Sequence, residues 1–207
     1  MLLILSCSGS REPSSDQISR FARGKSLYFN DSLEESLDIF TVLYDEIPSF
    51  RENAEMYARA LQYTGRPEEA AAVREVILED GFYYIDTVKA LSRYYIESER
   101  FGEAAAMLEA ALTYSSEDPT LLFLLARTHA RQDEFDRALS LLSGAEAIME
   151  RQVEIPLETA SLYQRYGFYE KAVSSITRCI AFVGEESPLL PALMRLMDNL
   201  EKETDDL

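Results

Sequence analysis

Apolar residues recur at helical spacing along residues 17–186, and short polar segments interrupt them at regular intervals. Apolar residues spaced in this way predict amphipathic helices. The polar segments include Asn30-Asp31-Ser32, Thr64-Gly65-Arg66-Pro67 and Gln132-Asp133-Glu134, and such residues favour turns. The pattern therefore predicts helices joined in pairs by short turns.

The pattern has a period of 34 residues. Frames that start at Gln17, Arg51, Ile85, Pro119 and Val153 align without a gap, and we number the positions of each frame as places 1 to 34. Small residues fill place 8 (Gly24, Ala58, Ser92, Ala126, Ala160) and place 20 (Ser36, Ala70, Ala104, Ala138, Ala172). Place 11 is Leu27, Leu61, Tyr95, His129 and Tyr163, and place 17 is Leu33, Pro67, Phe101, Phe135 and Tyr169. Two small columns with bulky columns between them predict two helices per frame, packed closely where the small residues meet.

These columns resemble the tetratricopeptide repeat family, whose 34-residue helix–turn–helix has small residues at places 8 and 20. The resemblance implies an all-α, right-handed superhelix of five repeats: 17–50, 51–84, 85–118, 119–152 and 153–186. Two features depart from the family pattern: its closing proline survives only as Pro48, and Arg74 replaces a bulky residue at place 24.

A sixth frame opens at Ser187, where Ser187-Pro188 resembles a helix N-cap followed by proline in the first turn. Leu190, Leu193, Met194 and Met197 then recur at helical spacing. We expect residues 187–207 to form a capping helix with an acidic tail, as a solenoid requires at its end. Five helix pairs and this cap make eleven helices.

Residues 1–16 differ from the rest of the chain. A short apolar run ends at Cys7, and a polar tether follows. Ile4-Leu5-Ser6-Cys7 resembles the cleavage box of a bacterial lipoprotein signal, which implies lipidation of Cys7. The apolar run is short and has no preceding Lys or Arg, which a start further upstream would explain. The alternative is an apolar terminus with an incidental cysteine.

Composition excludes several classes of site. The net charge of −17 disfavours nucleic-acid binding, unless the basic residues are segregated. Two cysteines and one histidine provide no four-ligand zinc site, and we find no phosphate loop or catalytic triad order. We therefore expect no enzymatic activity, no metal and no cofactor.

Three kinds of single residue invite a functional interpretation, but their places favour the core. His129 shares place 11 with bulky residues, so we expect it inside the helix pair. Cys179 lies in a column with Ile77, Ala111 and Ala145, which favours a buried, inert thiol. We expect the methionines to fill gaps in the core; they are Met107, Met149, Met194 and Met197.

Charge is segregated by helix. The first fourteen places of the five frames contain ten basic and six acidic residues, a balance of +4, which leaves −21 for the remainder. Place 9 holds Lys25, Arg59, Arg93 and Arg127, then Ser161. In the family, the first helices line the concave groove and a stripe at places 2, 5, 9, 12 and 13 binds ligands. On this stripe lie the candidate groove residues: Phe21, Lys25, Tyr28, Phe29, Arg59, Tyr63, Lys89, Arg93, Phe123, Arg127, Arg131 and Arg165.

The resemblance implies a protein-binding scaffold, held at the bacterial cell envelope through Cys7, whose groove takes an extended or helical partner segment. The arginines favour an acidic segment with apolar anchors. In the alternative interpretation, these arginines pair with Glu55, Asp86 or Glu97 and hold neighbouring helices in register. Two other functions remain open: a cytoplasmic adaptor, and a small-molecule or lipid carrier with its pocket at Phe21, Tyr28 and Phe29.

Overall fold

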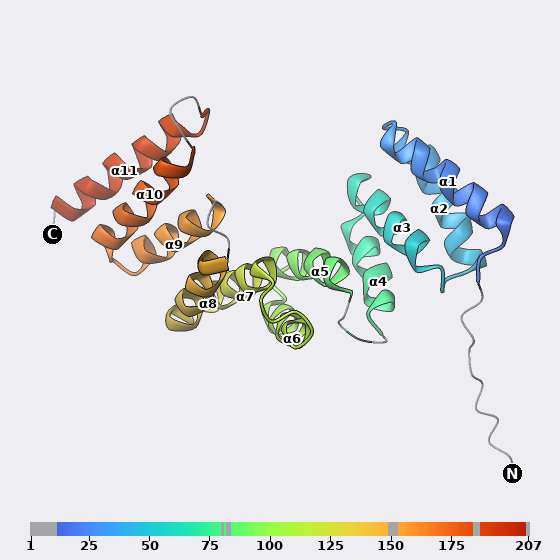
Figure 1. The fold of residues 1–207 in the computed structure, drawn as a ribbon, viewed down its shortest axis with the longest axis horizontal. Helices are drawn as coiled ribbons and strands as arrows, with labels where there is room; N and C mark the ends of the chain where they lie inside the picture. The colour runs from blue at the N-terminus through green and yellow to red at the C-terminus, as the bar shows by residue number, and fades with distance from the viewer. Residues whose placement is uncertain (1–11, 80, 82–83, 149–152, 184–186, 206–207) are drawn as a thin grey trace, which may run out of the picture. The chain divides into compact units, whose positions relative to one another are not determined.

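The computed structural model describes residues 12–79, 81, 84–148, 153–183 and 187–205, and all regular structure in these residues is helical (Figure 1). The helices are α1 (Ser15–Phe29), α2 (Leu33–Glu46), α3 (Arg51–Tyr63), α4 (Pro67–Ile77), α5 (Ile85–Glu97), α6 (Phe101–Leu112), α7 (Pro119–Arg131), α8 (Phe135–Ile148), α9 (Glu154–Arg165), α10 (Tyr169–Val183) and α11 (Leu190–Asp205). The predicted all-helical fold of helix pairs is confirmed. The chain divides into two compact units, Met1–Tyr94 and Tyr95–Leu207.

The turn inside each helix pair has one geometry in all five frames. The residue at place 15 has a positive φ: Asp31 64°, Gly65 79°, Glu99 60°, Asp133 62° and Gly167 77°. The next backbone N–H, at place 16, donates to the carbonyl oxygen at place 11 over 2.8–3.0 Å. These two features end a helix in the manner of a Schellman motif. Every second helix then begins at place 17.

The small columns are buried throughout, because the two helices of a pair approach most closely there. All ten residues at places 8 and 20 are buried, and Ala58, Ala70, Ala126 and Ala138 have no exposed surface. A larger side chain at these places would have to push the helices apart. The columns that identified the repeat therefore have a packing role.

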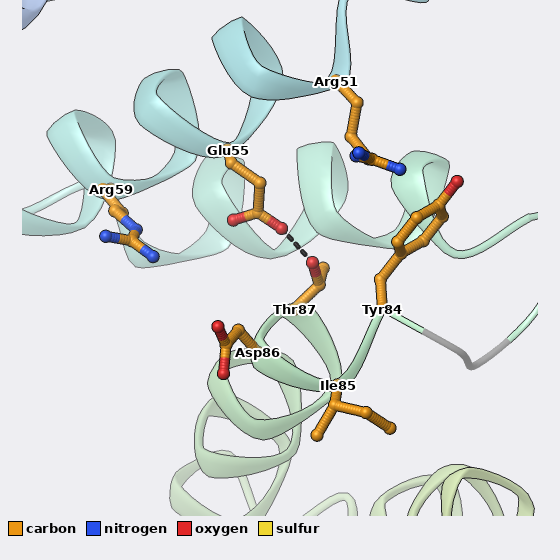
Figure 2. A pocket seen from close by; sticks show the side chains of 7 residues that line it. All are labelled: Arg51, Glu55, Arg59, Tyr84, Ile85, Asp86 and Thr87. Atoms are coloured by element: carbon orange, nitrogen blue, oxygen red, sulfur yellow. Dashed lines mark hydrogen bonds between the residues drawn. The ribbon is translucent and has the colours of Figure 1, made fainter. Parts of the chain in front are cut away.

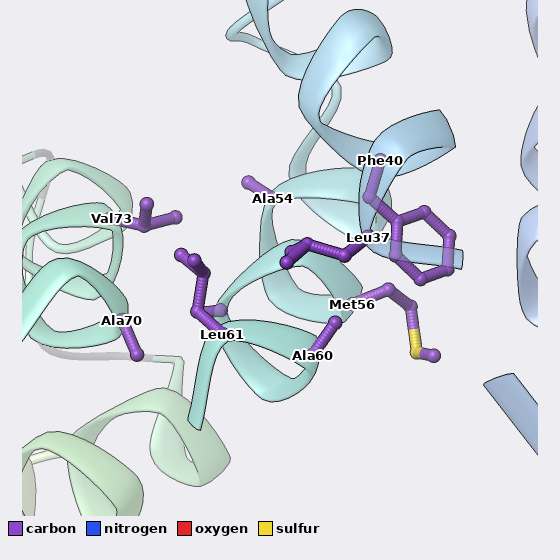
Figure 3. Packing of buried hydrophobic residues seen from close by; sticks show 9 residues of the cluster. Leu37, Phe40, Ala54, Met56, Ala60, Leu61, Ala70 and Val73 are labelled. Atoms are coloured by element: carbon purple, nitrogen blue, oxygen red, sulfur yellow. The ribbon is translucent and has the colours of Figure 1, made fainter. Parts of the chain in front are cut away.

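The core of the first unit packs between α2, α3 and α4 (Figure 3). Leu37 and Phe40 of α2 pack with Leu61 of α3 and Ala70 of α4, and all four side chains are buried. In the same unit, Arg74 occupies place 24 and is only 3% exposed.

Arg74 shows how the first unit accommodates a cation in place of a bulky apolar residue. Its Nη2 donates to Oε1 of Gln62 over 2.9 Å, while its Nε has no hydrogen-bond partner among the described residues. Burial lowers the pKa of the Arg74 guanidinium, and the nearby Glu55 carboxylate opposes that shift. The side chain keeps its charge because an arginine pKa starts far above neutrality.

The second unit packs its helices around two clusters. His129 is 4% exposed, so its predicted place inside the helix pair is confirmed. Nδ1 of His129 lies 2.7 Å from Oε2 of Glu134, in the turn between α7 and α8. Cys179 is fully buried, as predicted, and burial raises the pKa of its thiol to about 11. Such a thiol is a poor nucleophile at neutral pH.

The capping helix α11 covers α10 with one face. Leu193 and Leu200 are buried there, while Asp198 and Glu201 are exposed. The methionine prediction holds for Met107, which is 5% exposed, but it is wrong for Met194, which is 48% exposed. Met194 occupies place 8 of the sixth frame, where the second helix of a pair would cover it, and α11 is the last described helix. Met149 lies outside the described residues.

Candidate functional site

The place-9 cations of the first unit are exposed and unpaired. Lys25, Arg59 and Arg93 come from α1, α3 and α5, and each is on the surface of its helix. None of the three forms an ion pair or a hydrogen bond with another described residue; Lys25 lies 5.6 Å from the centroid of the Phe21 ring. Charged side chains without internal partners are available to a ligand.

The acidic residues expected to pair with these arginines do not form ion pairs with them among the described residues. The Glu55 carboxylate accepts a hydrogen bond from the Thr87 hydroxyl, which joins α3 to the first turn of α5. Asp86 is exposed and forms no ion pair with any residue in the described part of the chain. Glu97 is also exposed. These contacts favour the ligand interpretation for Arg59 and Arg93 over the interpretation as internal struts.

An aromatic cluster lies at the carboxyl ends of α1 and α3. The Tyr28 ring meets the Phe29 ring at 5.4 Å and the Tyr63 ring at 6.0 Å, both edge to face. Phe29 is 71% exposed and Tyr63 is 70% exposed. Burial raises the pKa of the Tyr28 hydroxyl, and the nearby Arg59 charge opposes the rise, so this arginine lies close to the cluster.

Phe21 contributes to the core more than to the surface. Its half-buried ring lies 6.1 Å from the Phe40 ring and 4.9 Å from the Phe50 ring. Protein therefore surrounds the ring on these sides. This packing disfavours the carrier alternative, which needs an open pocket at Phe21, Tyr28 and Phe29.

The stripe residues of the second unit divide into two groups. The Arg127 guanidinium lies 5.8 Å from the centroid of the Phe123 ring, and Arg131 is exposed without an ion pair to a described residue. Arg165 instead donates to the Ala130 carbonyl oxygen over 2.8 Å and pairs with Asp133. These bonds join α9 to the preceding turn, so Arg165 connects two neighbouring helices within the protein.

The remaining stripe residue of the first unit is Lys89, which is half-buried on α5.

A hollow of about 220 Å³ lies between α3 and the start of α5 (Figure 2). Arg51, Glu55 and Arg59 line it from α3, where a spacing of four residues places them on one face of the helix. Tyr84, Ile85, Asp86 and Thr87 line it from the start of α5. The sequence analysis missed this hollow, although Arg51, Glu55 and Arg59 at helical spacing were a usable signal.

The charged side chains around the hollow form two groups: Arg51 with Tyr84, and Arg59 with the two carboxylates. The Arg51 guanidinium lies 4.4 Å from the centroid of the Tyr84 ring, a cation–π contact. Figure 2 shows the Arg59 guanidinium on the side of the Glu55 and Asp86 carboxylates. The arrangement can bind charged and polar groups.

Two searches of the described residues bear on other kinds of site. No group of three or more His, Cys, Asp or Glu side chains in these residues could hold a metal ion. None of the described helices is both long enough and apolar enough to cross a membrane. Cys7, the candidate lipidation site, lies outside the described residues.

Solved structures with the same fold are numerous, although their sequences are distant. A tetratricopeptide repeat protein from Thermus thermophilus, TTC0263, has a TM-score of 0.66 at 18% identity, over 90% of this chain and 99% of its own. MamA from Desulfovibrio magneticus RS-1 has a TM-score of 0.75 at 13% identity, over 82% and 96%. YrrB, described as a tetratricopeptide repeat protein with an unusual peptide-binding site, has a TM-score of 0.71 at 16% identity, over 89% and 94%.

Comparisons of the sequence gave two results. No curated protein matches the sequence of this chain. Residues 95–154, however, match the model of the tetratricopeptide repeat. This match shows tetratricopeptide repeats in residues 95–154, and the helix pairs and buried small columns give the rest of the described chain the same fold.

Proposed function

We propose that the protein is a non-catalytic scaffold that binds a segment of a partner protein on the exposed face of its first helices. The observation that carries this proposal is the position of Arg59: it is exposed, has no ion pair with a described residue, and lies near Tyr28, whose ring contacts the exposed rings of Phe29 and Tyr63. Aromatic residues and arginine are the side chains that most often dominate binding energy at protein interfaces. The description of YrrB as peptide-binding agrees with this use of the fold.

The partner segment is acidic and carries apolar anchors. The guanidinium forks of Arg59, Arg93 and Arg127 suit carboxylates, since each fork can donate two parallel hydrogen bonds. The rings of Phe29 and Tyr63 suit aromatic or aliphatic side chains. Because the rest of the chain is strongly acidic, the arginines act at short range, within a Debye length of about 8 Å at physiological salt. Apolar contacts therefore supply most of the affinity, and charge sets the orientation.

A double charge reversal tests the proposal. Arg93→Glu combined with Arg127→Glu is expected to weaken capture of the partner from cross-linked cells. Little change in thermal stability is expected, because Arg93 is exposed, Arg127 is half-buried, and neither forms an ion pair with a described residue. Arg23→Glu is the matched control: Arg23 is exposed on α1 at place 7, off the stripe. The proposal fails if no captured protein distinguishes the double variant from the control, or if the double variant loses capture only in proportion to unfolding.

We also propose that the scaffold is tethered to a bacterial envelope membrane through acyl chains on Cys7. The support is the sequence Ile4-Leu5-Ser6-Cys7 followed by a polar tether. One acyl chain binds a membrane only marginally, whereas two or more anchor it stably. In the natural full-length gene product, Cys7→Ser is expected to move the protein from the membrane to the soluble fraction. Equal fractionation of both forms, with no added mass on Cys7, would favour the cytoplasmic adaptor.

A further inference from the structure

The hollow between α3 and α5 has a balanced charge, and the partner-binding proposal uses only one of its four charged side chains, Arg59. Two cations, Arg51 and Arg59, and two anions, Glu55 and Asp86, line it. Their charges cancel, so neither a free anion nor a free cation is favoured by the net charge of the hollow. A ligand that matches the lining must carry both signs.

Only two of these four side chains are available for a ligand. Arg51 lies over the Tyr84 ring and also approaches Glu52, at 3.7 Å. Glu55 accepts a hydrogen bond from Thr87 through one carboxylate oxygen, Oε1. Arg59 and Asp86, in contrast, form no ion pair or hydrogen bond with another described residue. The hollow therefore offers one free guanidinium from α3 and one free carboxylate from α5 (Figure 2).

The buried Arg74 further distinguishes Glu55, which has internal partners, from Asp86, which has none among the described residues. Its guanidinium interacts electrostatically with both Glu55 and Arg59 from the buried side of the unit. Arg74 and the Thr87 hydroxyl together offset part of the negative charge on Glu55. Asp86 is then the main acceptor for a positive group, and Arg59 is the main donor to a negative one.

We infer that this hollow binds the ammonium and carboxylate groups of a free α-amino acid. The Arg59 guanidinium donates two hydrogen bonds to the carboxylate, and the Asp86 carboxylate accepts from the ammonium. Oε2, the second oxygen of Glu55, is a further acceptor for the ammonium. The side chain of the amino acid lies against Tyr84 and Ile85, both half-buried.

The size of the hollow agrees with a ligand of this kind. Its volume of about 220 Å³ lies below the roughly 300–1,000 Å³ that is usual for pockets of drug-sized ligands. A lipid chain or a nucleotide exceeds this space, whereas an amino acid with a small or medium apolar side chain does not. Arg59 and Asp86 lie at places 9 and 2 of the stripe, so this site overlaps the face proposed for the partner. The partner-binding proposal uses Arg59 but not Asp86 or Tyr84, and substitution of Asp86 therefore tests the hollow separately.

Blocked amino acids provide a direct test on the full chain. Calorimetric titration with glycine, alanine, leucine and phenylalanine identifies the side chain preferred, at concentrations up to about 10 mM. Leucinamide lacks the carboxylate and N-acetyl-leucine lacks the ammonium. If both charges are recognised, each blocked form binds at least about tenfold more weakly than leucine, since hydrogen bonds to charged groups are the stronger class.

Substitutions of Arg59 and Asp86 test whether the amino acid binds in this hollow. Arg59→Gln and Asp86→Asn are each expected to weaken leucine binding at least about tenfold. Arg93→Gln is the matched control, since Arg93 is exposed on α5 and does not line the hollow. Thermal melting of each variant confirms that it is folded, as expected for substitutions of exposed residues. Partner capture by Asp86→Asn is expected to match that of the wild type.

Four outcomes would overturn the inference. They are binding by none of the four amino acids, binding of leucinamide as tight as that of leucine, binding of N-acetyl-leucine as tight as that of leucine, and equal loss of binding in Arg93→Gln. The second outcome would indicate a site for cations alone, and the third a site for anions alone. Loss of partner capture in Arg93→Glu/Arg127→Glu with intact leucine binding would separate the two functions.

Discussion

Gly24 of α1 lies against the ring of Phe40 in α2: a Cβ atom added at Gly24 would lie 2.7 Å from Cε1 of Phe40. Real Cβ atoms do not approach other atoms so closely, and the Phe40 ring is fully buried. The absence of a side chain at place 8 thus sets the distance between the first two helices.

Gly24→Ala is therefore expected to destabilise the protein by about 1–3 kcal/mol through overpacking. The control is Gly102→Ala in α6, where an added Cβ would meet nothing within 4 Å. This control is expected to gain about 1 kcal/mol, because alanine favours a helix over glycine. Urea unfolding of both variants measures the two differences. A gain in stability in both would contradict the close contact at Gly24.

Place 15 allows a second matched pair of substitutions, because its φ is positive in every repeat. Glu99→Gly is expected to stabilise the protein by about 1 kcal/mol, since the left-handed region costs a residue with a Cβ roughly that amount. Gly65→Ala is expected to destabilise it by a similar amount. An added Cβ at Gly65 has nothing within 4 Å, so only the backbone conformation changes in energy. Unchanged midpoints of thermal unfolding in both variants would argue against this turn geometry.

Overpacking at place 20 tests the register of the repeat. Ala138 has no exposed surface, so Ala138→Phe is expected to cost roughly 1–3 kcal/mol. Ala106→Phe is the control, because Ala106 is exposed on α6. Thermal denaturation of the two variants compares the buried and the exposed site directly. Equal melting temperatures would contradict the burial of Ala138.

The lowered pKa of Glu46 predicts that the free energy of unfolding depends on pH in the acid range. Arg20 donates two hydrogen bonds to its carboxylate and Gln17 donates a third, and these bonds lower the pKa of Glu46 from 4.5 to about 2. A lowered folded-state pKa contributes stability above the unfolded pKa, and this contribution is lost as the pH falls from about 4.5 to about 2. The difference in unfolding free energy between wild type and Glu46→Gln should therefore be present at pH 7 and shrink over this range.

The control for this titration is Asp38→Asn in the same helix. Asp38 is exposed and forms no ion pair with a described residue. Its substitution is expected to change the free energy of unfolding little, because isolated surface charges contribute little. A difference for Glu46→Gln that stays constant between pH 7 and pH 2 would show that the bonds from Arg20 and Gln17 do not stabilise the folded state.

The sequence predicted those features of the fold that depend on local periodicity. The number of helices and the burial of His129 and Cys179 follow from columns that repeat every 34 residues, because equivalent places have equivalent neighbours. Place 15 holds Asp, Gly, Glu, Asp and Gly, and this turn-forming column was a signal for the left-handed residue that the sequence analysis did not use.

The features that were missed depend on contacts between repeats. Tyr84 and Asp86 meet α3 across the hollow, and no spacing within one repeat reveals which side chains face each other there. The bonds from Arg165 to Ala130 and Asp133 also join one repeat to the previous one. Arg74 is an exception, because its contacts lie within its own repeat: it stood out as a departure from its column, but only the structure shows that Gln62 and Glu55 accommodate it.

The repeated turn is closed by a backbone hydrogen bond, and this affects how far sequences that share the fold can differ. The bond from place 16 to place 11 involves no side chain, and close approach of the helices needs only small residues at places 8 and 20. Most other positions are then free to drift, which accounts for solved structures that share this fold at 13–18% identity. A lineage can in this way exchange the residues on its first helices, and with them its ligands, while the framework is inherited unchanged.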